Sequence, residues 1–210
     1  MTTWDILTTS IPHRHTRLLA LLETLDAQMD ASVRMILYRD NLEVPYGDKT
    51  RALIEASDAD YVSSIDDDDS VAPDFIPLVL EALKSEPDYV GFRVRWTRDG
   101  ARQWPVEHNL EFGCWEDRPQ LLCRDIAQFN PIRRELALPE AWAGAWRADR
   151  DWSDAVRATG LVKTQVFIPG EMYYYQNTSY DHFQMARSPV QGPMPELPSY
   201  PWLRQIGPYA

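Results

Sequence analysis

Hydrophobic positions recur with two different spacings along the first 96 residues of the chain. Short apolar runs bounded by polar residues, glycine or proline are typical of buried β-strands, and we expect them at residues 4–12, 32–40, 60–65 and 88–96. Between these runs, apolar residues recur three or four positions apart, as on one face of a helix. This spacing predicts helices at residues 16–29, 47–57 and 72–87. The alternating order predicts an α/β fold with a mostly parallel sheet and helices on both faces.

After the fourth predicted strand the pattern is less regular, with scattered tryptophans and prolines. A helix and two late strands are predicted at residues 149–160, 162–169 and 171–176. Residues 188–210 are rich in proline, and we expect them to wrap around the surface or extend loosely from it. The sequence therefore predicts one domain over residues 1–187, followed by a proline-rich tail.

The length and net charge of the chain limit the kinds of fold and of binding partner that we expect. The chain has 210 residues, of which 44% are hydrophobic, which is enough for a core of its own. Its formal net charge of −11 disfavours broad contact with nucleic acid or an anionic membrane, and it favours a bound divalent cation. The sequence contains neither a signal-peptide pattern nor a membrane-length apolar run, so we expect a cytoplasmic protein without a membrane partner. Cys114 and Cys123 are too few for a zinc framework, and we expect them to be reduced.

Four consecutive aspartates, from Asp66 to Asp69, follow the third predicted strand. Ligands of parallel sheets bind beyond the carboxyl ends of the strands, so this run lies where a ligand is expected. Alternate residues of an extended chain point the same way, which places the carboxylates of Asp66 and Asp68 together. Two carboxylates combined with phosphate oxygens are a common way to hold Mg²⁺ or Mn²⁺ against a nucleotide. The alternative is a solvated acidic loop.

Two other kinds of metal site use aspartates in a short loop. A calcium loop beginning at Asp66 would need glycine at its sixth position and glutamate at its twelfth, but the chain has Val71 and Pro77 there. A phosphatase of the haloacid dehalogenase type would fit the spacing of Asp66 and Asp68, with Ser70 after them. Such enzymes, however, carry the aspartate pair after their first strand. Calcium binding is therefore excluded, and phosphate-ester hydrolysis remains an alternative.

Four segments, in order, resemble a family 2 glycosyltransferase of the GT-A fold. They are "TTSIPHRHTRLLALLETL", "YGDKTRALIEASDADYVSSIDDDDSVAPDF", "FNPIRRELA" and "ADRDWSDAVRATG". The likeness is to small soluble members from bacteria and phages, and it extends over residues 4–160. It implies a Rossmann-like sandwich in which residues 1–96 bind a nucleotide sugar and residues 97–187 bind the acceptor.

The resemblance implies a donor site for a nucleotide sugar, most readily a UDP-sugar, together with Mn²⁺ or Mg²⁺. Asp66 and Asp68 match the D-x-D motif whose last carboxylate binds the metal, and His182 matches a late histidine that is a metal ligand in some relatives. The positions that match contacts to the nucleotide or the donor sugar are Pro12, Arg14, Asp40, Lys49, Arg51, Asp66 and Asp67.

Asp149 matches the catalytic base of the family. Sugar transfer from a nucleotide diphosphate leaves negative charge on the diphosphate, which a divalent cation neutralises. The acceptor hydroxyl loses its proton to a carboxylate, and a single displacement inverts the anomeric centre. The family commonly has glutamate where this chain has Ala148, so Asp151 is a competing candidate for the base. Acidic residues in the first turn of a helix also stabilise its dipole without any catalytic role.

The acceptor is open at this level: a hydroxylated DNA base, a glycan or a small molecule, in a bacterial or phage-infected cell. We expect a monomer or a small homo-oligomer. Ala148 keeps open a module that binds sugar or nucleotide without turnover. Arg133 and Arg134 are either a phosphate clamp or a solvated pair. Two roles are possible for the tryptophans of this region: they form a stacking platform for the acceptor, or they belong to the core. The residues are Trp104, Trp115, Trp142 and Trp146.

Overall fold

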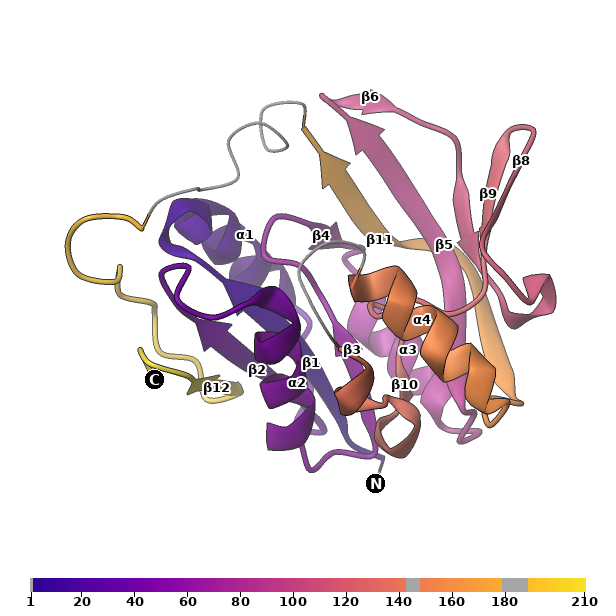
Figure 1. The fold of residues 1–210 in the computed structure, drawn as a ribbon, viewed down its shortest axis with the longest axis horizontal. Helices are drawn as coiled ribbons and strands as arrows, with labels where there is room; N and C mark the ends of the chain where they lie inside the picture. Colours follow the sequence, from indigo (N-terminus) through magenta and orange to yellow (C-terminus); the bar gives the residue numbers. More distant parts are fainter. Residues whose placement is uncertain (1, 143–147, 179–188) are drawn as a thin grey trace.

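The central sheet is built on three parallel strands. A computed structural model describes residues 2–142, 148–178 and 189–210. In it, β1 (Trp4–Ser10) lies between β2 (Val33–Arg39) and β3 (Tyr61–Ser64) and is parallel to both. Figure 1 shows these strands side by side in indigo and purple. Their carboxyl ends therefore meet at one edge of the sheet, as the alternating sequence pattern predicts.

The sheet changes direction at β10 (Ile132–Arg133), which is antiparallel to both of its neighbours, β3 and β5 (Tyr89–Arg98). Along its whole length β5 pairs in parallel with β11 (Gln165–Asn177). The sequence pattern predicts two late strands here, but β11 is one strand with two shifts of register. Pro169 lies in the first shift, where a proline without an N–H is tolerated.

Shorter strands complete the sheet on the side of β5. Beyond β5 the order is β7, β9 and β8, whereas β6 pairs with the end of β5 and β4 pairs with β11. Their bounds are β4 (Ser70–Val71), β6 (Ala101–Arg102), β7 (Val106–His108), β8 (Glu116–Arg118) and β9 (Leu121–Arg124). Most of them lie in the part of the chain that lacks a periodic pattern, because two to four residues are too few to establish one.

In the described part of the chain, two α-helices pack against each face of the sheet. One core contains apolar residues of α1 (His15–Asp26) and α3 (Phe75–Leu83), and the other those of α2 (Tyr46–Ala56) and α4 (Ala148–Thr159). Figure 1 shows α2 and α4 on the near side of the sheet. Helices on both faces are therefore confirmed, and α1 owes its place to its buried leucines, Leu18, Leu21, Leu22 and Leu25. Short 3₁₀ turns lie at Pro12–Arg14, Leu110–Phe112, Arg134–Leu136 and Pro139–Ala141.

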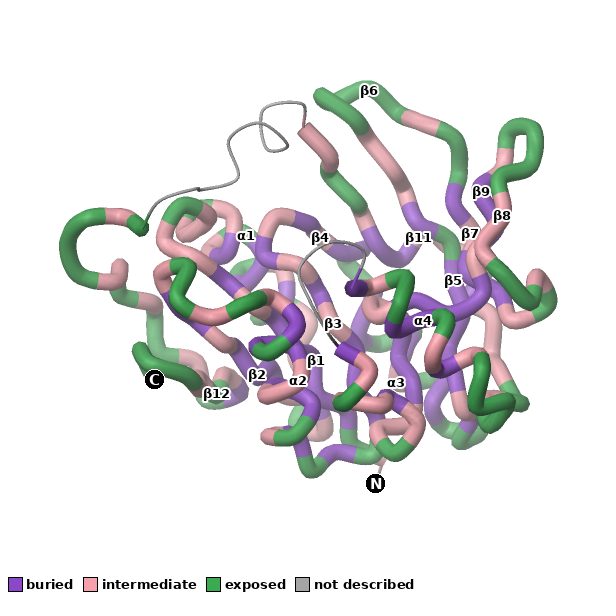
Figure 2. Tube along the Cα trace, viewed as in Figure 1, coloured by how far each residue is buried: buried purple, intermediate pink, exposed green. Residues whose placement is uncertain are grey.

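Buried residues concentrate along the central strands and the inner faces of the helices (Figure 2). Of the tryptophans considered for a stacking platform, Trp142 is a core residue, 1% exposed and stacked on Trp152 of α4. Trp115 is half-buried and donates its indole N–H to the carbonyl of Ile126. Trp104 is 52% exposed, and Trp146 lies outside the described residues.

The proline-rich end of the chain contributes a strand to the sheet. β12 (Leu203–Ile206) pairs in parallel with β2 and forms the edge opposite the short strands. Just before it, the Trp202 indole packs against the α1 side of the sheet and donates to the carboxylate of Asp26 at 2.8 Å. The surrounding prolines interrupt the alternating pattern of a strand, so this strand is not predicted from the sequence.

Among the helices of the described residues, none is long and apolar enough to cross a membrane. Both cysteines are free thiols: Cys114 is exposed and Cys123 is buried. Burial raises the pKa of the Cys123 thiol, which keeps it protonated and unreactive at neutral pH. Neither cysteine is among the residues that line the cavity described next.

Candidate active site

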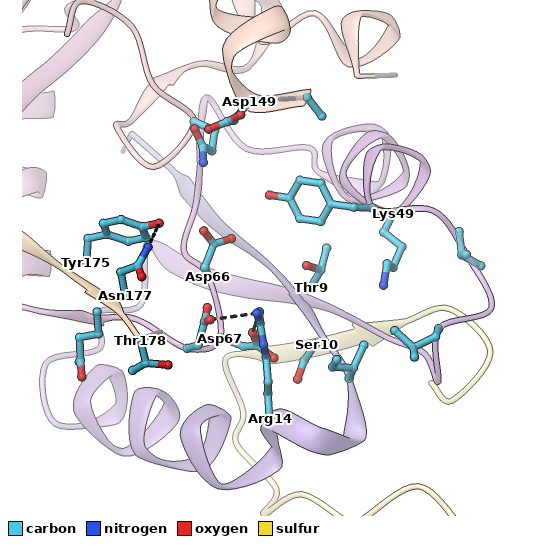
Figure 3. Close-up of a pocket in the computed structure, with 18 residues that line it drawn as sticks. Thr9, Ser10, Arg14, Lys49, Asp66, Asp67, Asp149, Tyr175, Asn177 and Thr178 are labelled. Carbon is cyan, nitrogen blue, oxygen red and sulfur yellow. Dashed lines mark hydrogen bonds and ion pairs between the residues drawn. The ribbon is translucent and has the colours of Figure 1, made fainter. Parts of the chain in front are cut away.

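A cavity of about 430 Å³ opens at the edge where the carboxyl ends of β1 and β3 meet. Figure 3 shows Asp66 between Asp149 on one side and the pair of Asp67 and Arg14 on the other. Side chains converge here from the sheet edge, from the starts of α2 and α4 and from the end of β11. The cavity is lined by Thr9, Ser10, Ile11, Arg14, Leu42, Val44, Tyr46, Lys49, Asp66, Asp67, Asp68, Gln128, Ala148, Asp149, Tyr175, Gln176, Asn177 and Thr178.

The four aspartates after β3 have two different roles. The first three line the cavity, whereas Asp69 does not. Asp69 accepts hydrogen bonds from the Tyr173 hydroxyl at 2.7 Å and from the backbone N–H of Gln176 at 2.8 Å, both in β11. The Tyr173 hydroxyl in turn accepts from the backbone N–H of Asp66 at 3.2 Å. Asp69 therefore fixes the acidic turn to β11, and the turn presents the other three carboxylates to the cavity.

Arg14 forms ion pairs with two of these carboxylates. Its guanidinium lies 3.0 Å from an oxygen of Asp67 and 3.0 Å from an oxygen of Asp68. Burial alone would lower the pKa of Arg14, but the charges of Asp67 and Asp68 raise it overall. Pro12 does not line the cavity; it begins the 3₁₀ turn that carries Arg14. Pro12 thus contributes to the geometry of the site without facing it.

The acidic turn carries more negative charge than its two arginines compensate: Arg14, and Arg17, whose guanidinium lies 3.8 Å from an oxygen of Asp68. Burial, followed by the charge of Asp68, raises the pKa of Asp66 to about 7. Burial also raises the pKa of Asp67 to about 6, even though Arg14 opposes the shift. One carboxylate oxygen of Asp67 is buried and has no hydrogen-bond partner among the described residues. Buried negative charge that is only partly compensated is costly, so the site favours a cationic or hydrogen-bonding ligand.

The donor set fits a divalent metal held jointly by protein and ligand. Among the described residues, no group of three or more His, Cys, Asp or Glu side chains is arranged to hold a metal ion on its own. Two carboxylates, Asp66 and Asp68, face the same cavity. Mg²⁺ is often bound by one or two carboxylates together with substrate phosphates and water, so these two residues suit that mode. His182, the third predicted ligand, lies outside the described residues.

A buried ion pair supports the opposite end of the cavity. The Lys49 ammonium lies 2.6 Å from a carboxylate oxygen of Asp40, and the other oxygen accepts from the backbone N–H of Val44 at 2.8 Å. Asp40 is fully buried and does not line the cavity, but Lys49 does. Arg51 is not brought to the cavity: its guanidinium donates to the carbonyl of Trp142 at 2.8 Å.

The start of α4 distinguishes the two candidate bases. Asp149 lines the cavity, whereas Asp151 is exposed and does not. The helix is held in place by Trp152, which donates to the carbonyl of Ala137 at 2.5 Å, and by Ser153, whose hydroxyl donates to the carbonyl of Ile126 at 2.6 Å. Asp149 is therefore presented from a well-supported helix.

The matched pair of arginines in "FNPIRRELA" lies away from the cavity. Arg133 pairs with Asp88, and its guanidinium lies over the ring of Tyr61. Arg134 begins the 3₁₀ turn Arg134–Leu136 and donates its backbone N–H to the carbonyl of Asp60. Neither residue forms a phosphate clamp with the aspartate turn.

A family model described as glycosyl transferase family 2 matches residues 18–137, which include the whole aspartate turn and the ion pair of Asp40 and Lys49. The chain belongs to this family. Comparison with proteins of curated function gives no match.

Solved structures place this family 2 member in the GT-A fold. The crystal structure of residues 1–349 of S. aureus TarS matches with a TM-score of 0.62 at 12% identity, covering 87% of this chain and 62% of that one. The same fragment in complex with UDP-GlcNAc gives a TM-score of 0.65 at 9% identity, covering 90% and 62%. A mycobacterial protein gives 0.52 at 13% identity, covering 84% and 66%. This chain thus spans about three fifths of the TarS fragment, 62% of its length.

The structure of this family 2 member adds site residues that sequence reasoning missed. Tyr46 lines the cavity and packs edge-on against the buried Trp142, with ring centroids 5.9 Å apart. Burial, followed by the charges of Asp66 and Asp149, raises its pKa well above the usual range, so its hydroxyl stays a neutral hydrogen-bond donor. Gln128 and Tyr175 also line the cavity. The one feature of the sequence that could have indicated Tyr46 is its position directly before the predicted helix of residues 47–57.

Without metal, Asp66→Asn is expected to stabilise this family 2 member at high pH. Below about pH 3 the carboxyl of Asp66 is neutral in both the folded and the unfolded protein. Above its folded pKa of about 7 it is charged in both, and burial penalises only the folded state. The wild-type unfolding free energy therefore falls as pH rises from about 4 to 7, by about 2–4 kcal/mol. Thermal melts in EDTA should place the variant about 5–10 °C above wild type at pH 8 and level with it at pH 4.

Asp151→Asn is the matched control for that experiment, because Asp151 is an exposed aspartate of the same chain. Its stability should stay within about 1 kcal/mol of wild type at every pH, the most that a carboxylate in the first turn of a helix contributes through the helix dipole. Equal melting temperatures of wild type and Asp66→Asn at pH 8 would show that burial of the Asp66 charge carries no cost.

Proposed function

We propose that this protein is an inverting, metal-dependent glycosyltransferase that moves a sugar from a UDP-sugar to an acceptor hydroxyl. One observation carries the proposal: a single cavity is lined both by the aspartate turn, Asp66 to Asp68, and by Asp149 of α4. The turn supplies the carboxylates that a nucleotide diphosphate and its metal require. Asp149 supplies a carboxylate to take up a proton from the acceptor.

The donor is bound at the acidic end and along the neighbouring wall. Mn²⁺ or Mg²⁺ would be held by Asp66 and Asp68 and would neutralise negative charge on the departing diphosphate. Arg14, at the acidic end, places positive charge beside the phosphates, whereas Lys49, the other cavity-lining cation among the described residues, lies at the opposite end of the cavity. The buried Asp40 holds Lys49 in position.

The transfer is a single displacement. The acceptor oxygen forms a bond to the anomeric carbon as the bond from that carbon to the diphosphate oxygen breaks, and the electron pair of the broken bond leaves with UDP. The hydroxyl proton passes to the carboxylate of Asp149. Attack opposite the leaving group inverts the anomeric centre. A carboxylate in the first turn of α4 suits this role because its helix is held by core contacts of Trp152 and Ser153.

The likeness to TarS supports UDP as the nucleotide, because that protein has been crystallised with UDP-GlcNAc and with UDP. The position of the aspartates favours transfer over phosphate-ester hydrolysis. They follow β3, the third strand of the chain, and not the first strand as in the phosphatases considered above.

Calorimetry tests the proposal directly. Titration of UDP should show binding in the presence of Mn²⁺ and little or none in EDTA. A phosphatase would instead bind free phosphate or cleave an aryl phosphate, and a module without turnover would bind a nucleotide sugar but never hydrolyse or transfer it. Mass spectrometry of a panel of nucleotide sugars, scored for slow hydrolysis, then identifies the donor sugar. Hydroxylated DNA bases, glycans and small molecules form the acceptor panel.

A further inference from the structure

The C-terminal segment, residues 189–210, contacts the loop of residues 40–45 through hydrogen bonds at several points. The Asn41 side chain donates to the carbonyl of Val190 at 2.9 Å and accepts from its N–H at 2.8 Å. The hydroxyl of Tyr209 donates to the carboxylate of Glu43 at 3.0 Å. Residues separated by about 150 positions or more in sequence are thus joined on both flanks of the loop.

The end of β2, just before that loop, is held by the same segment. β12 pairs with β2 up to Tyr38, and the buried guanidinium of Arg39 donates to the carbonyl of Pro195 at 2.6 Å. Gly207 follows β12 with a φ of 93°, and a side-chain carbon there would lie 2.9 Å from the ring of Tyr38. Only glycine fits both this backbone conformation and this contact. The C-terminal segment is therefore closely fitted to the base of the loop.

The loop forms one wall of the proposed donor cavity. Leu42 and Val44 both line it, and Leu42 is 36% exposed there. The backbone of Leu42 has a φ of 68°, in the left-handed region that is unfavourable for a leucine. Such a conformation persists only where surrounding contacts enforce it. The hydrogen bonds of Asn41 and Glu43 lie on either side of Leu42, and that of Val44 to Asp40 follows.

We propose that the C-terminal segment is a positioning element of the donor site, which holds Leu42 and Val44 as an apolar wall against the nucleotide base. Asn41 and Tyr209 are its positioning residues, because their side chains make the contacts that cross from segment to loop. The identity of the ligand rests on the proposed function. Val44 and Lys49 both bond to Asp40, which places the wall beside Lys49. We therefore expect the segment to act on nucleotide binding and to leave the transfer step itself unchanged.

Asn41→Ala and Tyr209→Phe test the proposal by calorimetry with UDP and Mn²⁺. We expect the Kd for UDP to rise about 5–20-fold for Asn41→Ala and about 2–5-fold for Tyr209→Phe, from the loss of two hydrogen bonds and one. At saturating UDP-sugar, kcat should stay within about 2-fold of wild type, since a KM effect without a kcat effect marks a role in binding. Tyr200→Phe is the control, because Tyr200 belongs to the same segment and packs on Trp202.

Hydrogen–deuterium exchange gives a readout that needs no ligand. In Asn41→Ala, the backbone N–H of Val44 should exchange faster, while amides of β1 and α1 keep the wild-type rate. Unchanged UDP affinity in both variants, or unchanged exchange at Val44, would overturn the inference. A wild-type protein that does not bind UDP would refute the proposed function instead, and exchange at Val44 would still decide whether the segment holds the loop.

Discussion

Asp149→Asn is expected to lower kcat for sugar transfer by about 10²–10⁴-fold, the usual contribution of a general base. Asparagine keeps the size and shape of the side chain at the start of α4 but takes up no proton. The Kd for UDP with Mn²⁺ should stay unchanged, because the acidic turn and Lys49 are left intact. The measurement is kcat from initial rates at saturating donor, alongside calorimetry of UDP.

The control for that variant is Asp151→Asn, which alters an exposed aspartate two residues further along the same helix. Any contribution of Asp149 through the helix dipole, about 0.3–1 kcal/mol, is shared by Asp151 and would appear in both melting curves. A loss of turnover in Asp151→Asn but not in Asp149→Asn would reverse the assignment of the base. Full turnover in both variants would show that the catalytic base does not lie on α4.

Asp68→Ala is expected to abolish the dependence of UDP binding on Mn²⁺. Asp68 lines the cavity with Asp66, and its loss leaves one carboxylate of the pair that is proposed to hold the metal. In this variant Arg14 loses its 3.0 Å contact to Asp68 but keeps the one to Asp67. Any residual UDP binding should therefore be weak and insensitive to EDTA. Calorimetry with and without Mn²⁺ measures both quantities.

Asp74→Ala is the matched control for the metal experiment. Asp74 is an exposed aspartate six positions further along, and its side chain makes no capping hydrogen bond at the start of α3. This variant should keep the wild-type Kd and its response to EDTA. If Asp68→Ala bound UDP with Mn²⁺ as tightly as wild type, the metal would not be held by the D-x-D pair.

The sequence predicts the first half of the fold well because that half consists of long periodic elements. β1, β2 and β5 have seven residues or more, and the helices between the strands have several turns. β3 has only four residues and is recognised as a short apolar run. β10 has two residues, and its place between β3 and β5 depends on pairing with strands more than 40 positions away. β12 lies among prolines and is stabilised by the edge of β2 and the burial of Trp202. Such elements follow from tertiary contacts, which a local pattern does not contain.

For the site, the sequence identifies the residue types that the chemistry requires better than it predicts which of their side chains face the cavity. Asp66, Asp68 and Asp149 reach the cavity because their motif stands at the end of a strand or the start of a helix. Arg51 lies two positions after Lys49 on α2, which rotates it away from Lys49 and toward the carbonyl of Trp142. Tyr46 acquires its place only when α2 packs beside Trp142.

The pairing of β12 with β2 joins residues about 168 positions apart, Leu203 with Met35 and Ile206 with Tyr38. During synthesis, the outer edge of β2 is left without its neighbour until residues 203–206 have left the ribosome. An uncovered strand edge of this kind is a template for association with other chains. The β2 edge of a nascent chain is thus open to association with other chains throughout the synthesis of residues 40–202, and a chaperone that shields this edge would raise the yield of folded protein.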